Sequence, residues 1–391
     1  MSVDFDTKIP LRNTHSLKYD MMEKVCGVGD PDALSMWVAD MDFKPPQAVH
    51  DALQAEIDRG LFCYFGDDST TRSAICDWMA DQHGWRFEPD RILFSHGVVA
   101  GLSITLEAFS DPDDSVILFT PVYHAFARKI KAMGRLVHEC PMPIEDGAYV
   151  MDLDGLRRAL TPRHKILIFC SPHNPGGKIW TADEIRALAA FCAEHNLILV
   201  SDEIHMDLTF PGQRHVPTAI AAPECSPRLV TLTAASKGFN LAGGETGFII
   251  AEDPAVLARL TKAHLALGGT PNRFGMIMTE AALRHGAQWS RDVRAYIAGN
   301  FSLFRDGVNA IPGVSVMDMP STYLAWVDFA GTGMTANEVS DRVAKMARIA
   351  TSAGPSFGAG GETFKRFNLA MPRAMVLEAV TRLQHAFSDL Q

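Results

Sequence analysis

The sequence predicts an α/β protein with a mostly parallel central sheet in a large domain and a smaller α+β domain beside it. Short apolar runs alternate with longer amphipathic segments through the middle of the chain. Several of the short runs are continuously apolar and rich in β-branched residues, as expected of strands buried on both faces. Polar residues, among them an asparagine, an aspartate and a lysine, follow three of these runs, so we expect a ligand site at the ends of the strands.

Strands and helices of the large domain alternate along the sequence. One helix is predicted over 183–194, because Thr181 supplies an N-cap and Ile185 and Leu188 fall on one face. A second helix, over 98–109, leaves the strand before it directly. This alternation predicts a parallel sheet covered by helices. The predicted strands lie at 91–95, 115–120, 165–170, 197–201, 228–233 and 248–251.

The two ends of the chain have a different pattern. Residues 1–44 show little periodicity, and the alternation stops near residue 285. We therefore expect a large domain at 45–285 and a small domain built from 1–44 together with 286–391. The elements expected after residue 290 are a long helix, strands at 314–317 and 323–327, a helix near 336–347 and a final helix from Met375.

Composition excludes several classes of protein. The 391 residues suit two domains, and a hydrophobic content of 47% excludes intrinsic disorder. The sequence has 36 basic and 46 acidic side chains, which gives a net charge of −10. With this acidic balance, no nucleic-acid partner is expected. No apolar run approaches the ~20 residues that a membrane-spanning helix needs, so no membrane partner is expected either.

Targeting signals and cysteine spacing predict a cytoplasmic protein. The N-terminus has no basic segment followed by an apolar one, so no secretory signal is predicted. The seven cysteines are scattered and include no CxxC pair, which indicates neither a disulfide framework nor a metal site. Reduced thiols are typical of the cytoplasm.

The polar residues that follow three strands make up the candidate site. Asn174 follows the strand at 165–170, Asp202 and His205 follow the strand at 197–201, and Lys237 follows the strand at 228–233. Each residue alone is a weak signal, since a turn, a cap or a chance lysine explains it equally well. Their common place at the carboxyl ends of strands is a stronger one. A lysine amine is also the side chain that forms Schiff bases with carbonyl groups.

This constellation resembles the fold-type-I pyridoxal-phosphate (PLP) enzymes, the aminotransferase class I/II superfamily, and the resemblance covers nearly the whole chain. It implies the PLP-transferase fold and pyridoxal 5'-phosphate as the cofactor. It also implies that Lys237 forms a Schiff base with the cofactor aldehyde and that Asp202 pairs with the pyridinium nitrogen. Asn174 and His205 are implied near the phenolic oxygen, and Tyr123 is implied to stack over the pyridine ring.

A separate segment is expected to bind the phosphate group. HGVVAG at 96–101 leaves a strand and opens a helix, whose free N–H groups favour an anion. The resemblance points to the backbone amides of Val98 and Val99, and to hydroxyl donors from Thr233 and Ser236. Many aminotransferases also carry a phosphate-binding arginine shortly after the lysine, but residues 241–247 contain none.

Three further segments indicate a branch of this superfamily. WVADMDF at 37–43, DEIHMDL at 202–208 and RFNLAMPR at 366–373 resemble signatures of the cystathionine β-lyase-like C–S lyases, the MalY/PatB type. The resemblance implies that Arg373 grips the substrate α-carboxylate, with a surface arginine at a helix start as the plain alternative. It also places Ala39 and Asp40 on the carboxylate side of the pocket.

The same branch implies a homodimer with a shared active site. Tyr64 lies where relatives have a tyrosine that reaches the PLP phosphate of the partner subunit, although the segment around it departs from the usual form.

The activity expected is PLP-dependent C–S β-lyase activity on cysteine thioethers (cystathionine or cysteine S-conjugates), giving thiol, pyruvate and ammonia. The catalytic residues implied are Lys237, Asp202 and Tyr123. Two alternatives stay open, an aminotransferase of a small amino acid and a PLP-binding regulatory protein. A lyase releases pyruvate and thiol without a keto-acid acceptor, which distinguishes it from both.

Overall fold

A seven-stranded sheet forms the centre of the computed structural model, which describes residues 3–390. Strand β10 is antiparallel to both of its neighbours, and the other four neighbouring pairs are parallel. The mostly parallel sheet predicted from the sequence is therefore present. In order across the sheet, the strands are β2 (Ile92–Ser95), β10 (Gly247–Ile250), β9 (Leu229–Thr233), β8 (Ile198–Asp202), β7 (His164–Cys170), β3 (Ser115–Thr120) and β4 (Leu136–Pro141).

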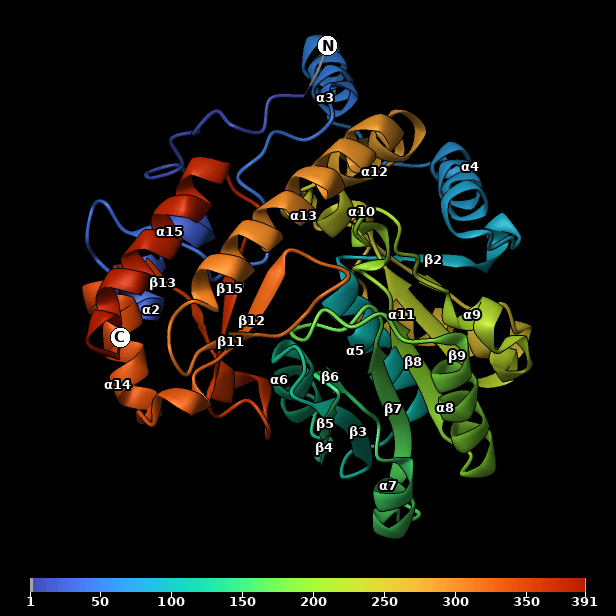
Figure 1. Ribbon diagram of the computed structural model, residues 1–391. Coiled ribbons are helices and arrows are strands. Elements are labelled where there is room, and N and C mark those ends of the chain that lie inside the picture. Colours follow the sequence, from blue (N-terminus) through green and yellow to red (C-terminus); the bar gives the residue numbers. More distant parts are fainter. Residues whose placement is uncertain (1–2, 391) are drawn as a thin grey trace.

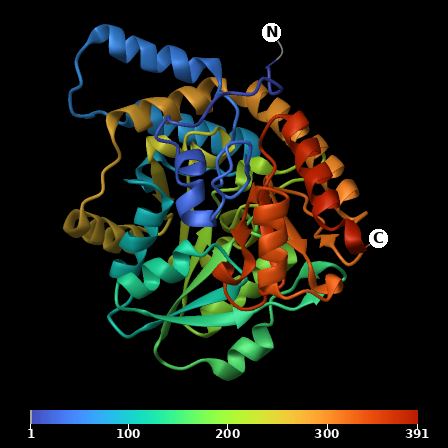
Figure 2. The same ribbon diagram turned by 90° about the vertical axis from the view of Figure 1, so that its left-hand side faces the viewer.

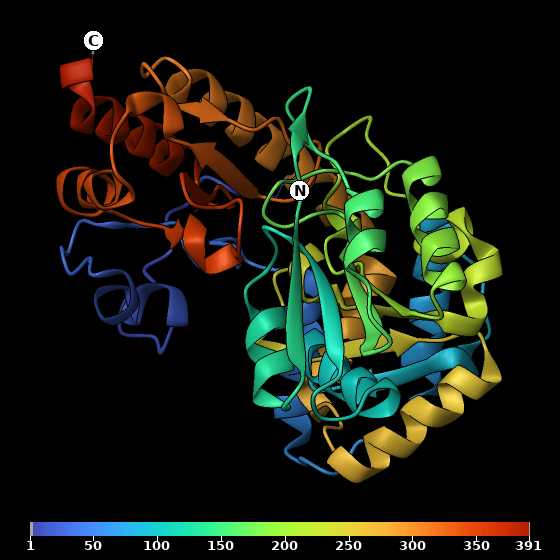
Figure 3. The same cartoon turned by 90° about the horizontal axis from the view of Figure 1, so that it is seen from below.

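Apolar side chains on both faces of this sheet explain its two layers of helices (Figure 3). On β3, Val116 and Leu118 pack in one core cluster, and Ile117 and Phe119 pack in another. Alternate side chains of a strand point to opposite faces, so continuous apolar runs need cover on both sides. One face is covered by α5 (Val98–Phe109), α6 (Ala125–Ala132) and α11 (Pro254–Leu267), and the other by α8 (Ala182–Glu194).

The start of α8 shows how local sequence sets a helix boundary. The Thr181 side chain accepts the N–H of Glu184, and the Glu184 carboxylate accepts the N–H of Thr181. This reciprocal capping box satisfies two donors that a helix start otherwise leaves unpaired. Ile185 and Leu188 then face the sheet and are fully buried, as predicted.

The small domain has its own antiparallel sheet, in the order β11 (Ser315–Val316), β12 (Leu324–Asp328), β15 (Phe364–Asn368) and β14 (Ser352–Ala353). Its apolar residues pack with those of α13 (Ala287–Val308) and α15 (Arg373–Ala386). Figure 1 shows these orange and red elements on the left and the green strands of the large sheet on the right.

Both ends of the chain meet in this small domain. Strand β1 (Leu34–Ser35) pairs in parallel with β13 (Ile349–Ala350), which lies more than 300 residues later. The expected domain boundaries at 45 and 285 stay a prediction. A segment not foreseen from the sequence is β15, and the helix predicted near 336–347 is α14 (Ala336–Asp341) continued by a π-helical turn over Arg342–Met346.

The remaining helices lie around these two sheets. After α3, the chain follows the edge of the molecule before it enters α4 (Figure 2). Across residues 3–390, none of the helices combines the length and the apolar character needed to cross a membrane. The other elements are α1 (Leu17–Asp20), α2 (Met22–Cys26), α3 (Gln47–Arg59), α4 (Ser69–Trp78), β5 (Ile144–Glu145), β6 (Ala148–Tyr149), α7 (Leu153–Ala159), α9 (Thr218–Ala221), α10 (Ala235–Gly238) and α12 (Arg273–His285).

Candidate active site

The carboxyl ends of β7, β8 and β9 bring the polar residues together. Cys170, the last residue of β7, is in register with Asp202, the last residue of β8. Asp202 is in turn in register with Leu232 of β9, and the short helix α10 that carries Lys237 follows two residues after that strand ends. Because these strands are adjacent and parallel, the side chains predicted from the sequence share one edge of the sheet.

Lys237 is held against a carbonyl oxygen of the N-terminal segment. Its Nζ donates to the Ala39 oxygen at 2.5 Å, and the same oxygen accepts the Tyr323 hydroxyl at 3.0 Å. Burial lowers the pKa of Lys237 to about 8, and Asp40 opposes that shift. Burial therefore raises the share of neutral amine near neutral pH, and only a neutral amine accepts a proton or attacks a carbonyl.

Asp202 is a buried carboxylate, 3% exposed, with a single hydrogen bond from the Ile204 N–H at 3.1 Å. Burial raises its pKa to about 7, and the neighbouring Glu203 charge adds to the shift. Within residues 3–390, no cationic side chain lies within 4.0 Å of it. A cationic ring nitrogen placed against it would stabilise the ionised form.

Asn174 and Arg366 form the other side of the site. Arg366 is 2% exposed on β15, and its Nη1 donates to the Asn174 Oδ1 at 3.0 Å. Its Nη2 donates to the Trp37 oxygen at 2.9 Å and the Ser352 Oγ at 3.2 Å, and burial lowers the pKa of Arg366 to about 10. In the described part of the chain its Nε has no acceptor and no carboxylate lies within 4.0 Å. A buried guanidinium with neutral partners only is suited to bind an anion.

Arg373, expected to grip a carboxylate, lies elsewhere. Its guanidinium is 4.5 Å from the Tyr296 ring, measured from the carbon to the ring centroid, and its Nε donates to the Asn300 Oδ1 at 3.2 Å. It opens α15 and packs against α13, so the structure does not bring it to Lys237. Arg366, from the same sequence segment, faces the site instead. A strand pattern with Arg366 and Asn368 on one face was the signal that could have identified it.

Two asparagine side chains hold the segment over 37–43 in place. The Asn240 side chain pairs with Met41, accepting its N–H and donating to its oxygen, both at 2.9 Å. The Asn368 amide donates to the Val38 and Asp40 oxygens at 2.6 and 2.5 Å. Sequence reasoning selected Ala39 and Asp40 here but missed the two asparagines, because their partners are main-chain atoms nearly 200 and more than 300 residues away.

Behind this segment is a buried ion pair. Lys18 is 1% exposed, and its Nζ lies 2.9 Å from the Asp42 Oδ1 and 3.6 Å from the Asp40 Oδ1. The Tyr19 hydroxyl donates to the other Asp42 oxygen at 2.6 Å. Burial raises the pKa of Asp40, which Lys18 partly opposes. Asp40 therefore lies between two amines, those of Lys18 and Lys237.

The expected phosphate site is the turn before α5. Gly97 has φ 76°, and a Cβ added to Gly247 of β10 would lie 2.7 Å from the Gly97 carbon and 2.8 Å from the Val98 nitrogen. Because of this close packing, only glycine fits at 247 beside the turn. Val98 and Val99 open the helix, where N–H groups have no intrahelical partner.

The two hydroxyls expected to bind the phosphate group, those of Thr233 and Ser236, differ from each other in their surroundings. Thr233 is buried and its Oγ1 donates to the Glu203 oxygen at 3.3 Å, so its donor is used within the sheet. Ser236 is partly exposed on α10, next to Lys237. His96 pairs with Glu245, which places a carboxylate rather than the usual arginine beside this turn.

The three remaining predicted residues differ in position. His205 is buried, its Nδ1 has no partner in the described chain, and burial lowers its pKa to about 3, so the ring is neutral. Tyr123 lines a cleft of about 660 Å³, and burial raises its pKa. Tyr64 is fully exposed between α3 and α4, and it contributes nothing to the site of its own chain.

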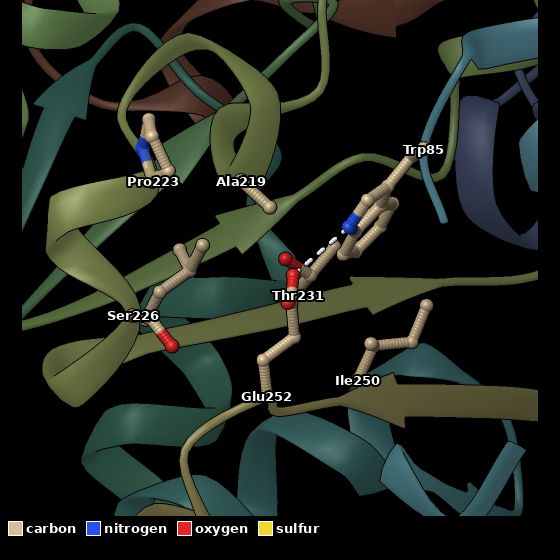
Figure 4. Close-up of a pocket in the computed structure, with 8 residues that line it drawn as sticks. Trp85, Ala219, Pro223, Ser226, Thr231, Ile250 and Glu252 are labelled. Carbon is tan, nitrogen blue, oxygen red and sulfur yellow. Dashed lines mark hydrogen bonds between the residues drawn. The ribbon is translucent and has the colours of Figure 1, made fainter. Parts of the chain in front are cut away.

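A second cavity lies at the opposite end of β9, where Leu229 begins the strand (Figure 4). The Trp85 indole N–H donates to Glu252 across it at 2.9 Å. With a volume of about 40 Å³, it is far smaller than a small-molecule site. We therefore assign the chemistry to the Lys237 edge.

Comparisons with known proteins agree with this geometry. Cystathionine beta-lyase PatB of Bacillus subtilis (strain 168) is 36% identical over 390 residues, covering 99% of this chain and 100% of the relative. The structure of cystalysin from Treponema denticola, which contains a pyridoxal 5'-phosphate cofactor, superposes with a TM-score of 0.95 at 33% identity and full coverage of both chains. The PLP-bound C–S lyase from Staphylococcus hominis superposes with a TM-score of 0.91 at 28% identity, covering 99% of this chain and 98% of the other.

These structures confirm the predicted fold class, the PLP-transferase fold of type I. Residues 32–383 match the family described as aminotransferase class I and II. The chain, with its lysine, aspartate and asparagine at adjoining strand ends, belongs to the aminotransferase class I and II family.

Proposed function

We propose that this protein is a PLP-dependent C–S β-lyase that cleaves cysteine thioethers, such as cystathionine or cysteine S-conjugates. Each turnover takes up one water and releases a thiol, pyruvate and ammonia. The observation that carries the proposal is the set formed by Lys237, Asp202 and the buried Arg366, in a chain whose relatives include cystathionine β-lyase PatB and PLP-bound C–S lyases.

The residues at the strand edge fit pyridoxal 5'-phosphate. Unpartnered buried polar atoms gather there, among them His205 Nδ1, Ser171 Oγ and Arg366 Nε. Asp202 would hold the ring nitrogen, and the amides of Val98 and Val99 would hold the phosphate group. When bound, the cofactor supplies an electron sink for negative charge that develops at the substrate Cα. Asn174 would contact the phenolic oxygen, Tyr123 would stack over the pyridine ring, and the Ser236 hydroxyl would donate to the phosphate group.

Arg366 binds and orients the substrate in this proposal. Its Nε has no acceptor in the described chain, so this N–H is available for a charge-assisted hydrogen bond to the α-carboxylate. Asn174 fixes the guanidinium from the other side. Because the arginine is already buried and ordered, little side-chain entropy is lost on binding.

Lys237 moves the proton. While its Nζ is free, Lys237 would remove the Cα proton and could later give that proton to the departing sulfur. Its lowered pKa of about 8 raises the fraction of neutral amine at neutral pH, and only that form can act as a base. Asp202 would be stabilised in its ionised form by a cationic ring nitrogen and would keep that nitrogen protonated. Tyr123 and Trp37 line the cleft beside the site.

A homodimer with a shared site is part of the proposal. Ile57, Leu61 and Phe62 expose more than half of their surfaces, and Tyr64 beside them is fully exposed. Exposed apolar residues in one region typically mark a protein interface. Tyr64 would then reach the phosphate group of the partner's site. The cytoplasmic location is also a proposal, supported by seven cysteines that are all free.

The deciding experiment uses purified holoenzyme with cystathionine and no keto acid. Pyruvate and free thiol in equal amounts support the lyase, and a Lys237→Ala variant should give neither. Turnover that requires an added keto acid would instead identify an aminotransferase. A spectral change with no product in either condition would favour the PLP-binding regulatory protein.

A further inference from the structure

The cleft beside the site carries an excess of positive charge. It has a volume of about 660 Å³, and it begins at residues that touch the site: Tyr123, and Trp37 and Ser352, which both accept from the Arg366 Nη2. Farther out, its lining includes Arg128 and Lys131. A thioether bound at Arg366 would extend its sulfur substituent into this space, because the cleft opens from the same residues.

Helix α6 determines how the charges are spaced. His124, Ala127, Arg128 and Lys131 follow one another at the spacing of a single helix face, and all of them line the cleft. With a rise of 1.5 Å per residue, Arg128 lies roughly 7 Å and Lys131 roughly 12 Å beyond Tyr123 along the helix axis. The charge of Arg128 influences the pKa values of both Tyr123 and His124, so it acts on the inner end of the cleft as well.

A third cation lies in the opposite wall. Lys365 of β15 is 7% exposed, lines the cleft, and has only the Ser340 hydroxyl as a partner, at 3.0 Å. Within residues 3–390, no carboxylate lies within 4.0 Å of Lys365, Arg128 or Lys131. A buried ammonium with only a hydroxyl partner retains capacity for an anion.

The single carboxylate of the lining does not balance these charges. Glu139 accepts the Ala359 N–H at 3.0 Å, so its oxygen is directed at the main chain. The His124 ring stays neutral, because burial and the nearby arginines lower its pKa to about 4. The lining therefore holds three cations against one anion.

We propose that the enzyme prefers cysteine conjugates whose sulfur substituent carries a net negative charge, with Arg128, Lys131 and Lys365 as the residues that select it. This inference rests on the proposed lyase function and deepens it. The matching group is a carboxylate at the end of a flexible chain about four to six bonds from the sulfur, as the helix spacing requires. Cystathionine, whose distal amine cancels its distal carboxylate, is then a weaker substrate than such a conjugate.

The test compares two substrates of nearly equal shape on the holoenzyme, S-(4-carboxybutyl)-L-cysteine and S-(4-carbamoylbutyl)-L-cysteine. We expect kcat/KM for the carboxylate to be about tenfold higher than for the amide, as for a charge-assisted contact. The ratio should fall towards one in the Arg128→Gln/Lys131→Gln variant. The matched control, Lys129→Gln, removes a charge from the same helix outside the cleft lining and should leave the ratio as it is.

Binding of an inert analogue separates this inference from the proposed function. 5-(Methylthio)pentanoate and its amide have no amino group and cannot react, so calorimetry on the holoenzyme measures binding without turnover, and the double variant isolates the contribution of the cleft. If the acid binds more tightly than the amide and the double variant loses this preference, the inference is supported even if no conjugate is turned over. If the acid and the amide bind equally and their conjugates have equal kcat/KM, the inference is overturned while the lyase function stands. If the double variant still prefers the acid, the assignment to Arg128 and Lys131 is overturned.

Discussion

The Nη1 of Arg366 donates to the Oδ1 of Asn174 at 3.0 Å, which joins a strand of the small domain to the end of a strand in the large one. One residue belongs to the antiparallel sheet and the other follows β7. The contact makes the position of the substrate arginine dependent on how the two domains sit together.

Substitution of Arg366 should affect substrate binding much more than substitution of Arg373. Arg366→Gln removes the buried guanidinium, and we expect kcat/KM for a cysteine thioether to fall about a hundredfold, the cost of losing a buried charge-assisted contact. Arg366→Lys should recover little of the lost kcat/KM, because an ammonium group cannot replace the planar guanidinium. Arg373→Gln is the matched control, since its guanidinium contacts Tyr296 and Asn300. Steady-state kinetics check both, and the reverse order of effects would restore Arg373 as the carboxylate ligand.

A methyl group at Gly247 should weaken cofactor binding. Gly247→Ala places a Cβ within 2.8 Å of two main-chain atoms of the turn before α5, so that turn must shift. We expect PLP affinity, measured by absorbance titration of the apoenzyme, to drop about tenfold. Gly243→Ala is the control on the same segment, because an added Cβ there has no neighbour within 4 Å. Equal affinities of the two variants would show that the turn does not hold the phosphate.

Lys237 should react as an amine of lowered pKa. In the apoenzyme, its acylation rate followed by mass spectrometry should reach half of its maximum near pH 8, against about 10.4 for the urea-unfolded chain. Between these values the unfolded chain holds a proton that the folded chain has lost, so this group makes the free energy of unfolding rise with pH. Asp40→Asn should move the midpoint lower, since Asp40 favours the charged amine. A midpoint near 10 would contradict the assignment.

Removal of the buried Lys18 charge should be costly. Lys18→Met leaves Asp42 buried without its cationic partner, and we expect the free energy of unfolding to fall by about 3–5 kcal/mol. The control is Lys24→Met, at an exposed position of α2, where a change within about 0.5 kcal/mol is expected. Urea denaturation of both variants measures the difference. A loss in Lys18→Met no larger than in the control would show that the pair is not needed for stability.

Two inactive variants should restore activity when mixed if the site is shared. Tyr64→Ala and Lys237→Ala chains, unfolded and refolded together, should form hybrid dimers in which one site combines an intact lysine with the partner's intact tyrosine. Random pairing predicts about one quarter of the wild-type activity. The two variants refolded separately and then combined are the control. No gain on refolding together would argue against a shared site.

Periodicity predicted the large domain well because its strands are buried on both faces. The strand at 115–120 and the helix at 98–109 coincide with β3 and α5, since long apolar runs leave little choice of structure. The edge strand β4 was missed, because its exposed and partly exposed residues mix polar with apolar types. The small domain was harder, as its short strands are specified by partners distant in sequence.

The residues of the site also divide into those that the sequence could predict and those that it could not. Lys237, Asp202 and Asn174 follow predictable strands, so their convergence could be foreseen. The choice between Arg366 and Arg373 could not, because it depends on which residues of one segment form β15 and which begin α15. Thr233 was predicted as a phosphate donor, but the sheet places its hydroxyl on the Glu203 carbonyl.

The contact between Lys237 and the Ala39 oxygen has a consequence for biosynthesis. The segment over 37–43 leaves the ribosome early, yet its supports Asn240 and Asn368 are made much later. Its Met41 and Phe43, which are buried in the folded chain, therefore lack their packing partners while most of the chain is translated. A nascent chain can build the large sheet during synthesis, but the contacts of Asn368 and Arg366 with this segment form only when the last part of the chain is made, so a chain truncated before β15 would lack a finished pocket.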